Sequence, residues 1–159
     1  MVELLSKRPI GKGGPVSRAG SVYIWGKGAI AGGNFVFVSG CEGKDYNDPL
    51  GRCIAPDIIA QTKLAFTKLK NVLEEAGTSL ENVVRFTWYV KKREDKQYFL
   101  KTRDEFFKEH APKLLEERSY ASTLLVGVEL DEPDMLCEVD AIAWIPPKEG
   151  STERASEAT

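Results

Sequence analysis

Residues 83–90, with the sequence VVRFTWYV, form the strongest predicted β-strand of the chain. Side chains of a strand alternate between its two faces. One face therefore carries Val84, Phe86, Trp88 and Val90, and the other carries Arg85, Thr87 and Tyr89. Large side chains on both faces are typical of a strand that is covered on both sides. A fold that packs both faces of this strand is therefore required.

Amphipathic helices are predicted on both sides of this strand in the sequence. The first begins at Pro56-Asp57 and ends at Gly77, a residue typical of a helix C-terminus. Its apolar residues recur at helical spacing and form one stripe, made of Ile58, Ala65, Leu69, Val72, Leu73 and Ala76. The second helix covers residues 94–109 and directs Phe99, Phe106 and Phe107 toward the sheet.

Four further strands complete the predicted fold. Residues 29–33 and 34–40 form a hairpin, and two strands near 120–128 and 135–144 follow the second helix. The element order is ββαβαββ, which predicts an α+β fold with one mixed sheet. Two helices can cover only one face of such a sheet. We therefore expect a second copy of the chain to cover the other face.

The predicted domain spans residues 29–146. Residues 1–28 are rich in glycine and form an N-terminal arm, and residues 147–159 form a polar tail that we expect to be disordered. Residues 42–56 carry the glycine, proline and aspartate residues of an exposed loop.

Composition excludes several classes of function. The chain has 22 basic and 24 acidic residues and a formal charge of −2, which offers no general attraction for nucleic acid or membranes. It has no apolar run long enough to span a bilayer and no signal peptide, so we expect a cytoplasmic protein. Three separated cysteines and one histidine, His110, argue against a zinc site.

Four segments in this order resemble the YjgF/RidA (UK114) family: FVFVSG at 35–40, EEAGTSLENVV at 74–84, FTWYV at 86–90 and CEVDAIA at 137–143. The resemblance covers roughly residues 29–146. It implies a chorismate-mutase-like fold and a homotrimer whose sheets line a central barrel, with clefts between subunits. It also implies hydrolysis of reactive enamines or imines to carbonyl compounds and ammonia, without a cofactor.

The resemblance assigns the central role to Glu138. This residue matches the glutamate of the family, which would position a water, accept its proton and return the proton to the leaving amine. The alternative is a glutamate that lines the barrel and forms hydrogen bonds across the trimer. Ser39 and Gly40 match the segment that bounds the cleft, where they would bind a substrate carboxylate or carbonyl, or simply end a strand.

Two further residues have less specific assignments. Cys41 would line the pocket, although packing is the more usual role of a buried thiol. Trp25, together with Tyr23 in the N-terminal arm, would close over a planar substrate or pack against a neighbouring subunit.

Thr123 marks the main departure from the family. It lies fifteen residues before Glu138, where family members carry an arginine that binds the substrate carboxylate. A threonine cannot form the bidentate, charge-assisted hydrogen bonds that an arginine forms with a carboxylate. Arg118, five residues upstream, either reaches the cleft or is a surface charge. Alternatively, the substrate is bulkier or carries its carboxylate elsewhere; the resemblance includes relatives that deaminate products such as 2-aminomuconate.

The resemblance therefore implies a cofactor-free deaminase that acts on an enamine or imine, with 2-aminomuconate or a related imine derived from an amino acid as the expected substrate. A ligand-binding or chaperone-like trimer without turnover is the alternative. An endoribonuclease is disfavoured by the acidic charge balance.

Overall fold

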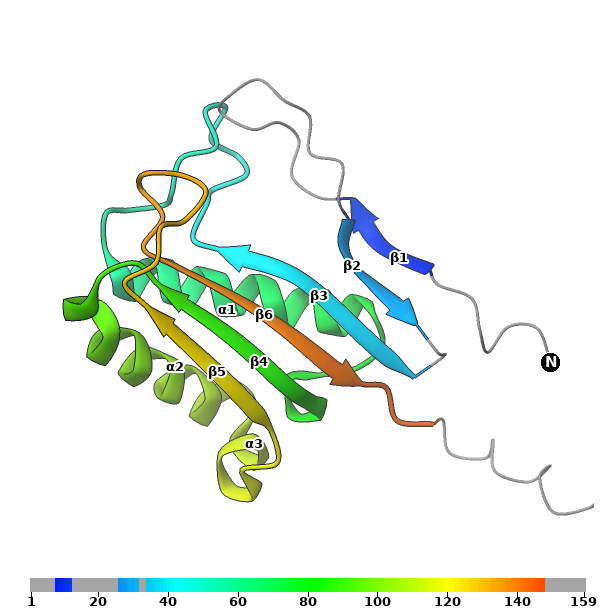
Figure 1. Cartoon of the computed structure of the whole chain (residues 1–159). Coiled ribbons are helices and arrows are strands. Elements are labelled where there is room, and N and C mark those ends of the chain that lie inside the picture. The colour runs from blue at the N-terminus through cyan, green and yellow to red at the C-terminus, as the bar shows by residue number, and fades with distance from the viewer. Residues whose placement is uncertain (1–7, 13–25, 32–33, 148–159) are drawn as a thin grey trace, which may run out of the picture.

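The computed structural model describes residues 8–12, 26–31 and 34–147. Its six strands form one sheet in the order β1-β2-β3-β6-β4-β5 (Figure 1). The strands are β1 (Arg8–Lys12), β2 (Gly26–Ala31), β3 (Phe35–Glu42), β4 (Val83–Val90), β5 (Ala121–Val126) and β6 (Cys137–Trp144). The helices are α1 (Ile58–Glu75), α2 (Lys96–His110) and α3 (Pro112–Glu117), with single 3₁₀ turns η2 (Leu80–Asn82) and η3 (Arg93–Asp95).

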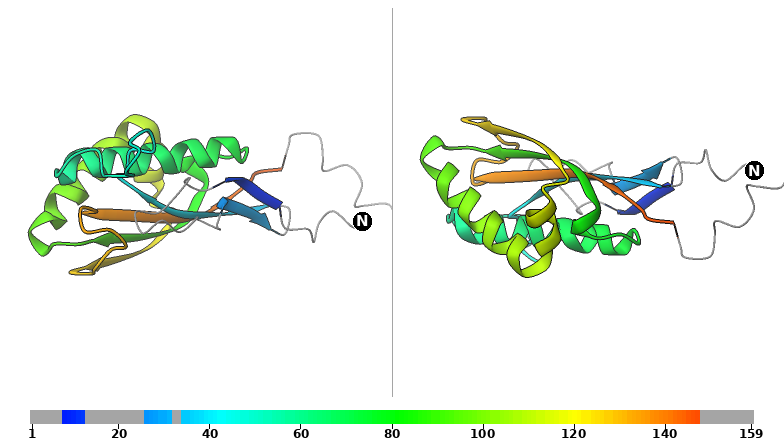
Figure 2. Two further views of the ribbon diagram at one scale, coloured as in Figure 1. Left: turned by 90° about the horizontal axis from the view of Figure 1, so that it is seen from above. Right: turned by 90° about the horizontal axis from the view of Figure 1, so that it is seen from below.

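The sheet is mixed, as the sequence predicted. β4 and β5 are parallel because α2 and α3 connect them, whereas all other neighbouring strands are antiparallel. The predicted hairpin is confirmed, with Ala31 of β2 opposite Phe35 of β3. Figure 2 shows that the helices lie on one side of the sheet. The opposite side, which we call the open face, has no helix of the described chain over it.

The boundaries of α1 agree with the sequence prediction. Asp57 accepts hydrogen bonds from the backbone of Ile59 and Ala60, which satisfies two amides at the helix N-terminus. Gly77 has φ of 86°, and the amides of Gly77 and Thr78 donate to the carbonyls of Glu74 and Leu73. This pair of bonds is a Schellman motif, which favours glycine at that position.

Phenylalanine rings fill the space between the helices and the sheet. Phe66 of α1 lies 5.2 Å from Phe107 of α2 and 6.0 Å from Phe99, measured between ring centroids. Phe86 of β4 stacks beside Phe107 at 5.5 Å. All four side chains are fully buried. This core fixes the helix-covered face of β4 and leaves the alternate residues of that strand on the open face.

The structure corrects the predicted faces of β4 at one position. A register shift between Val83 and Arg85 turns Val83 into the core, whereas Val84 is 40% exposed. Phe86, Trp88 and Val90 are buried as predicted. Alternation fails at Val84 because a shift in register breaks the period of two residues on which it depends.

Three other segments differ from the sequence prediction. The predicted arm contains strand β1, and residues Pro112–Glu117 form α3, where only the end of the preceding helix was expected. The predicted loop at 42–56 is not uniformly exposed, because Glu42 is the last residue of β3 and is buried, as are Gly43 and Lys44. The predicted tail lies almost entirely outside the described residues. In the described part of the chain, no helix is long and apolar enough to cross a membrane.

Gln61 joins α1 to the segment that leads into β6. Its amide nitrogen donates to the carbonyls of Ala55 and Asp134, at 2.7 and 2.9 Å. Its amide oxygen accepts from the backbone of Leu136 at 2.8 Å. The side chain is fully buried and lies against Gly43, where an added Cβ would stand 2.8 Å from the Cα of Gln61. This glutamine therefore places the start of β6 against β3 and α1.

Replacement of Gln61 by leucine should lower the free energy of unfolding by about 3 kcal/mol, because buried backbone groups lose their partners. Chemical denaturation measures the change. Asn71→Ala, at an exposed position of the same helix, serves as the control and should change stability by less than about 0.5 kcal/mol. Equal stability of the Gln61→Leu variant and the unmodified protein would show that these bonds do not hold the junction.

Candidate functional site

Strand β3 contains a bulge where it runs beside β6. Val38 pairs with Ala141, and Cys41 pairs with Val139, so three steps along β3 match two steps along β6. Ser39 and Gly40 therefore stand opposite the single residue Asp140. A bulge of this kind redirects side chains and is common beside active sites.

The carboxyl group of Glu138 lies over Gly40. A Cβ added to Gly40 would overlap the Oε1 atom of Glu138 and stand 2.8 Å from its Cδ. The carboxyl group therefore occupies space that any residue other than glycine would fill. Glu138 alternates with the buried residues Cys137 and Val139, so it belongs to the open face.

The surroundings of Glu138 disfavour its charged form. Partial burial, followed by the negative charges of Glu42 and Asp140, raises the pKa of Glu138 from 4.5 to about 6. At pH 7 such a carboxyl group is mostly ionised, yet it accepts a proton far more readily than an ordinary glutamate. It can therefore act as a base and then as an acid near neutral pH.

Asp140 and Tyr89 continue the open face beside Glu138. Tyr89 pairs with Glu138 across the β4–β6 ladder, and its hydroxyl donates to Oδ2 of Asp140 at 3.2 Å. Partial burial and then the charge of Asp140 raise the pKa of Tyr89. The phenol therefore stays protonated near pH 7 and can donate this bond.

A charged cluster closes the end of β3. Glu42 pairs with Glu138 in register and accepts hydrogen bonds from Tyr46 at 2.9 Å and from Lys68 of α1 at 3.2 Å. Lys68 also lies over the ring of Tyr46, with Nζ 3.8 Å from its centroid. The ion pair with Lys68 offsets part of the cost of burying the Glu42 carboxylate.

At the other edge of the open face, Arg85 reaches from β4 to β5. Its Nη2 atom donates to Oγ1 of Thr123 at 3.2 Å. Thr123 pairs with Thr87, and Arg85 itself pairs with Ala121. The guanidinium group therefore leans along the strands toward the level of Thr87 and Asp140.

The structure brings together some of the predicted site residues. Ser39, Gly40, Thr123 and Glu138 all lie on the strands that form the open face. Arg118 does not join them: it is exposed, has φ of 50°, and precedes the end of β5 that is farthest from the level of Glu138. Within one copy of the chain, Arg118 therefore does not lie beside Glu138, and its role at a cleft between copies stays a prediction. Trp25 and Tyr23 lie outside the described residues.

Cys41 lies in the buried core rather than on the open face. Its side chain is 6% exposed, and burial, followed by the charge of Glu42, raises the pKa of the thiol to about 12. The thiol is therefore neutral near pH 7 and a poor nucleophile. This placement favours the packing interpretation.

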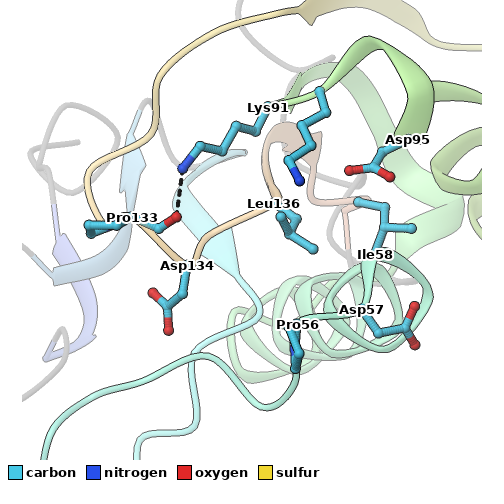
Figure 3. A pocket seen from close by; sticks show the side chains of 9 residues that line it. Pro56, Asp57, Ile58, Lys91, Asp95, Pro133, Asp134 and Leu136 are labelled. Carbon is cyan, nitrogen blue, oxygen red and sulfur yellow. Dashed lines mark hydrogen bonds between the residues drawn. The ribbon is translucent and has the colours of Figure 1, made fainter.

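A separate pocket of about 360 Å³ lies at the N-terminus of α1 (Figure 3). Lys91 points across it, and its Nζ donates to the carbonyl of Pro133 at 2.6 Å. Asp57, on its wall, caps α1. The pocket contains none of the predicted site residues, and these two polar groups have structural partners. The pocket is therefore a weaker candidate than the open face for binding or catalysis.

Sequence reasoning did not select Asp140, Glu42 or Arg85 as site residues. Alternation alone placed Arg85 on the face opposite Phe86, but only the register between strands shows that it reaches Thr123. Asp140 is two residues after Glu138, so its presence on the same face was a usable signal. Among the described residues, no group of three or more His, Cys, Asp or Glu side chains could hold a metal ion.

Comparison with known proteins supports this description. Residues 19–145 match the sequence model of a family described as Endoribonuclease L-PSP. A RutC family protein of Pyrococcus abyssi is 35% identical over 116 residues, which cover 73% of this chain and 83% of that protein.

Solved structures show the same fold. The E. coli YjgF gene product has a TM-score of 0.67 and 23% identity, and the match covers 86% of this chain and 98% of that one. E. coli TdcF, solved with bound serine, has a TM-score of 0.67 and 20% identity over the same shares of the two chains. The chain therefore belongs to the Endoribonuclease L-PSP family, also known as the YjgF/RidA family.

Proposed function

We propose that the protein is a deaminase that hydrolyses an enamine or imine to a carbonyl compound and ammonia, without a cofactor. The observation that supports this most directly is the carboxyl group of Glu138, which lies over Gly40 on the open face and has a pKa raised to about 6. A base of this strength suits proton transfer at neutral pH.

The proposed reaction has two steps, and Glu138 acts in both. Ionised Glu138 accepts a proton from a water molecule while the water oxygen forms a bond to the carbon of a protonated C=N group. The electron pair of the C=N π bond moves to nitrogen, which becomes a neutral amine, and the product is a carbinolamine. Protonated Glu138 then gives its proton to the amine, the C–N bond breaks with its electron pair leaving on ammonia, and the C=O bond forms as the hydroxyl proton passes to Glu138, which releases it to solvent.

The substrate that we favour is 2-aminomuconate or a related imine derived from an amino acid. The relative TdcF was solved with bound serine, which supports a ligand of the amino-acid class. Thr123 supports a substrate other than a small 2-imino acid, because it replaces the arginine that the family resemblance implies at that position.

We also propose that the protein is a homotrimer with its sites between subunits. The end of the open face away from Glu138 is apolar: Phe35, Phe37 and Trp144 are 39%, 46% and 38% exposed. Phe35 pairs with Trp144 across β3 and β6, and Phe37 is two residues further along β3, so the three side chains share one face of the sheet. Burial of such a band against other copies would remove apolar surface from water.

Hydrolysis of RNA, which the family description names, has weaker support. The centre of the open face carries the carboxylates of Glu138 and Asp140, with Glu42 beside them. These groups would repel the phosphates of a nucleic acid. The same groups tolerate a neutral or protonated C=N group.

Replacement of Glu138 by glutamine should reduce ammonia release at least about a hundredfold, because glutamine cannot accept the proton of water. Ammonia is measured with 2-aminomuconate and with imines that an amino-acid oxidase generates from amino acids. Glu116→Gln, at an exposed position of α3, is the control and should retain activity.

A Glu138→Gln variant with undiminished turnover would rule out the proton-transfer role. If the unmodified protein releases no ammonia from any of these compounds, the ligand-binding alternative becomes the better description.

The dependence of activity on pH should also report on Glu138. Activity requires its ionised form, so the rate should rise with pH through the pKa of about 6. Asp140→Asn removes a negative charge that raises this pKa, and the acidic limb of the kcat/KM profile should therefore move to lower pH. Asp131→Asn removes a charge that raises the pKa of Glu138 less, so this variant should shift the acidic limb of the kcat/KM profile by a smaller amount. An unchanged limb in the Asp140→Asn variant would mean that another group controls the profile.

A further inference from the structure

Arg85 is a cation on the open face whose function in the fold is not evident. Its side chain is exposed, and its hydrogen-bond partner in the described part of the chain is the neutral hydroxyl of Thr123. Most other charges near the site have opposite partners: Lys68 binds Glu42, and Lys44 lies 3.6 Å from Glu132. An arginine that is held in place without an opposing charge keeps its capacity to bind an anion.

Charge is distributed unevenly over the open face. Glu138 and Asp140 lie on β6, whereas Arg85 extends over β4 and β5. A ligand carboxylate placed beside Glu138 would be repelled by both acidic side chains, whereas the same carboxylate beside Arg85 would be attracted. The face is therefore complementary to a ligand with its carboxylate at one end and its C=N group at the other.

The register of the strands sets the separation of these two ends. The carboxyl group of Glu138 lies over Gly40 of β3, and the guanidinium group lies between β4 and β5. Gly40 stands opposite Asp140, which pairs with Thr87, so the two groups lie near the same level along the strands. About two and a half strand spacings across the sheet place the guanidinium group on the order of 12 Å from that carboxyl group.

We propose that Arg85 binds a carboxylate several bonds away from the C=N group and thereby selects elongated, acidic substrates. This inference rests on the proposed deaminase function and adds the substrate class. Arg85 takes over, from a neighbouring strand, the anchoring role that Thr123 cannot perform. It is a specificity residue and takes no part in proton transfer.

A matched pair of substrates tests this role. The imine derived from glutamate carries a distal carboxylate, and the imine derived from glutamine has nearly the same shape without that charge. The unmodified protein should show the higher kcat/KM with the glutamate-derived imine. Arg85→Met should reduce this preference about tenfold, mainly through KM, because a charge-assisted hydrogen bond of about 1.4 kcal/mol corresponds to that factor.

Two control variants distinguish the effect of the charge at position 85 from that of the planar guanidinium group and from the loss of a positive charge elsewhere in the chain. Arg93→Met removes the same charge from an exposed position in η3, at the other end of β4, and should leave the preference unchanged. Arg85→Lys keeps the charge but loses the planar fork, and should give an intermediate preference. A preference in Arg85→Met equal to that of the unmodified protein would overturn the proposal.

Binding of muconate, a six-carbon dicarboxylate that cannot release ammonia, gives a readout that does not depend on turnover. Calorimetry should show affinity about tenfold lower in Arg85→Met than in Arg93→Met. If the unmodified protein hydrolyses no imine but this difference is found, the deaminase proposal fails and the carboxylate site stands. If Arg85→Met binds muconate as tightly as Arg93→Met, the carboxylate site is wrong, whatever the enzyme hydrolyses.

Discussion

The site depends on the close approach of the Glu138 carboxyl group to the backbone of Gly40. Space for this approach exists because Gly40 has no Cβ and because the bulge in β3 sets two residues against Asp140. The carboxyl group is thereby held against the sheet, where it loses part of its hydration. Loss of hydration is the largest contribution to its raised pKa, and the proposed chemistry follows from that pKa.

Most of the fold could be predicted from periodicity and from the residues that end helices. Asp57 and Gly77 marked the ends of α1, and the aromatic positions of α2 were found from their spacing alone. Two of the failures share one cause. Val84 and the buried segment from Glu42 to Lys44 lie next to register shifts or long-range ion pairs, and these depend on a neighbouring strand or loop that no local pattern contains.

The same limit explains what was predicted of the site. Glu138, Ser39 and Gly40 were selected by family resemblance, and the structure places them beside one another. The absence of an arginine at Thr123 was visible in the sequence, but its counterpart was not. Arg118 is nearer to Thr123 in sequence, whereas Arg85, thirty-eight residues away, donates a hydrogen bond to it. Pairing of β4 with β5 brings Arg85 and Thr123 together. Because a long connection separates these strands in the sequence, the sequence alone does not indicate this contact.

Direct titration of the Glu138 carboxyl group tests the central claim. ¹³C NMR of the full chain labelled at glutamate side chains, with Glu138→Gln used to assign the resonance, gives the pKa of this single group. We expect a value of about 6. A value at or below 4.5, the ordinary value for glutamate, would show a fully hydrated carboxylate and would contradict the proposed role of Glu138.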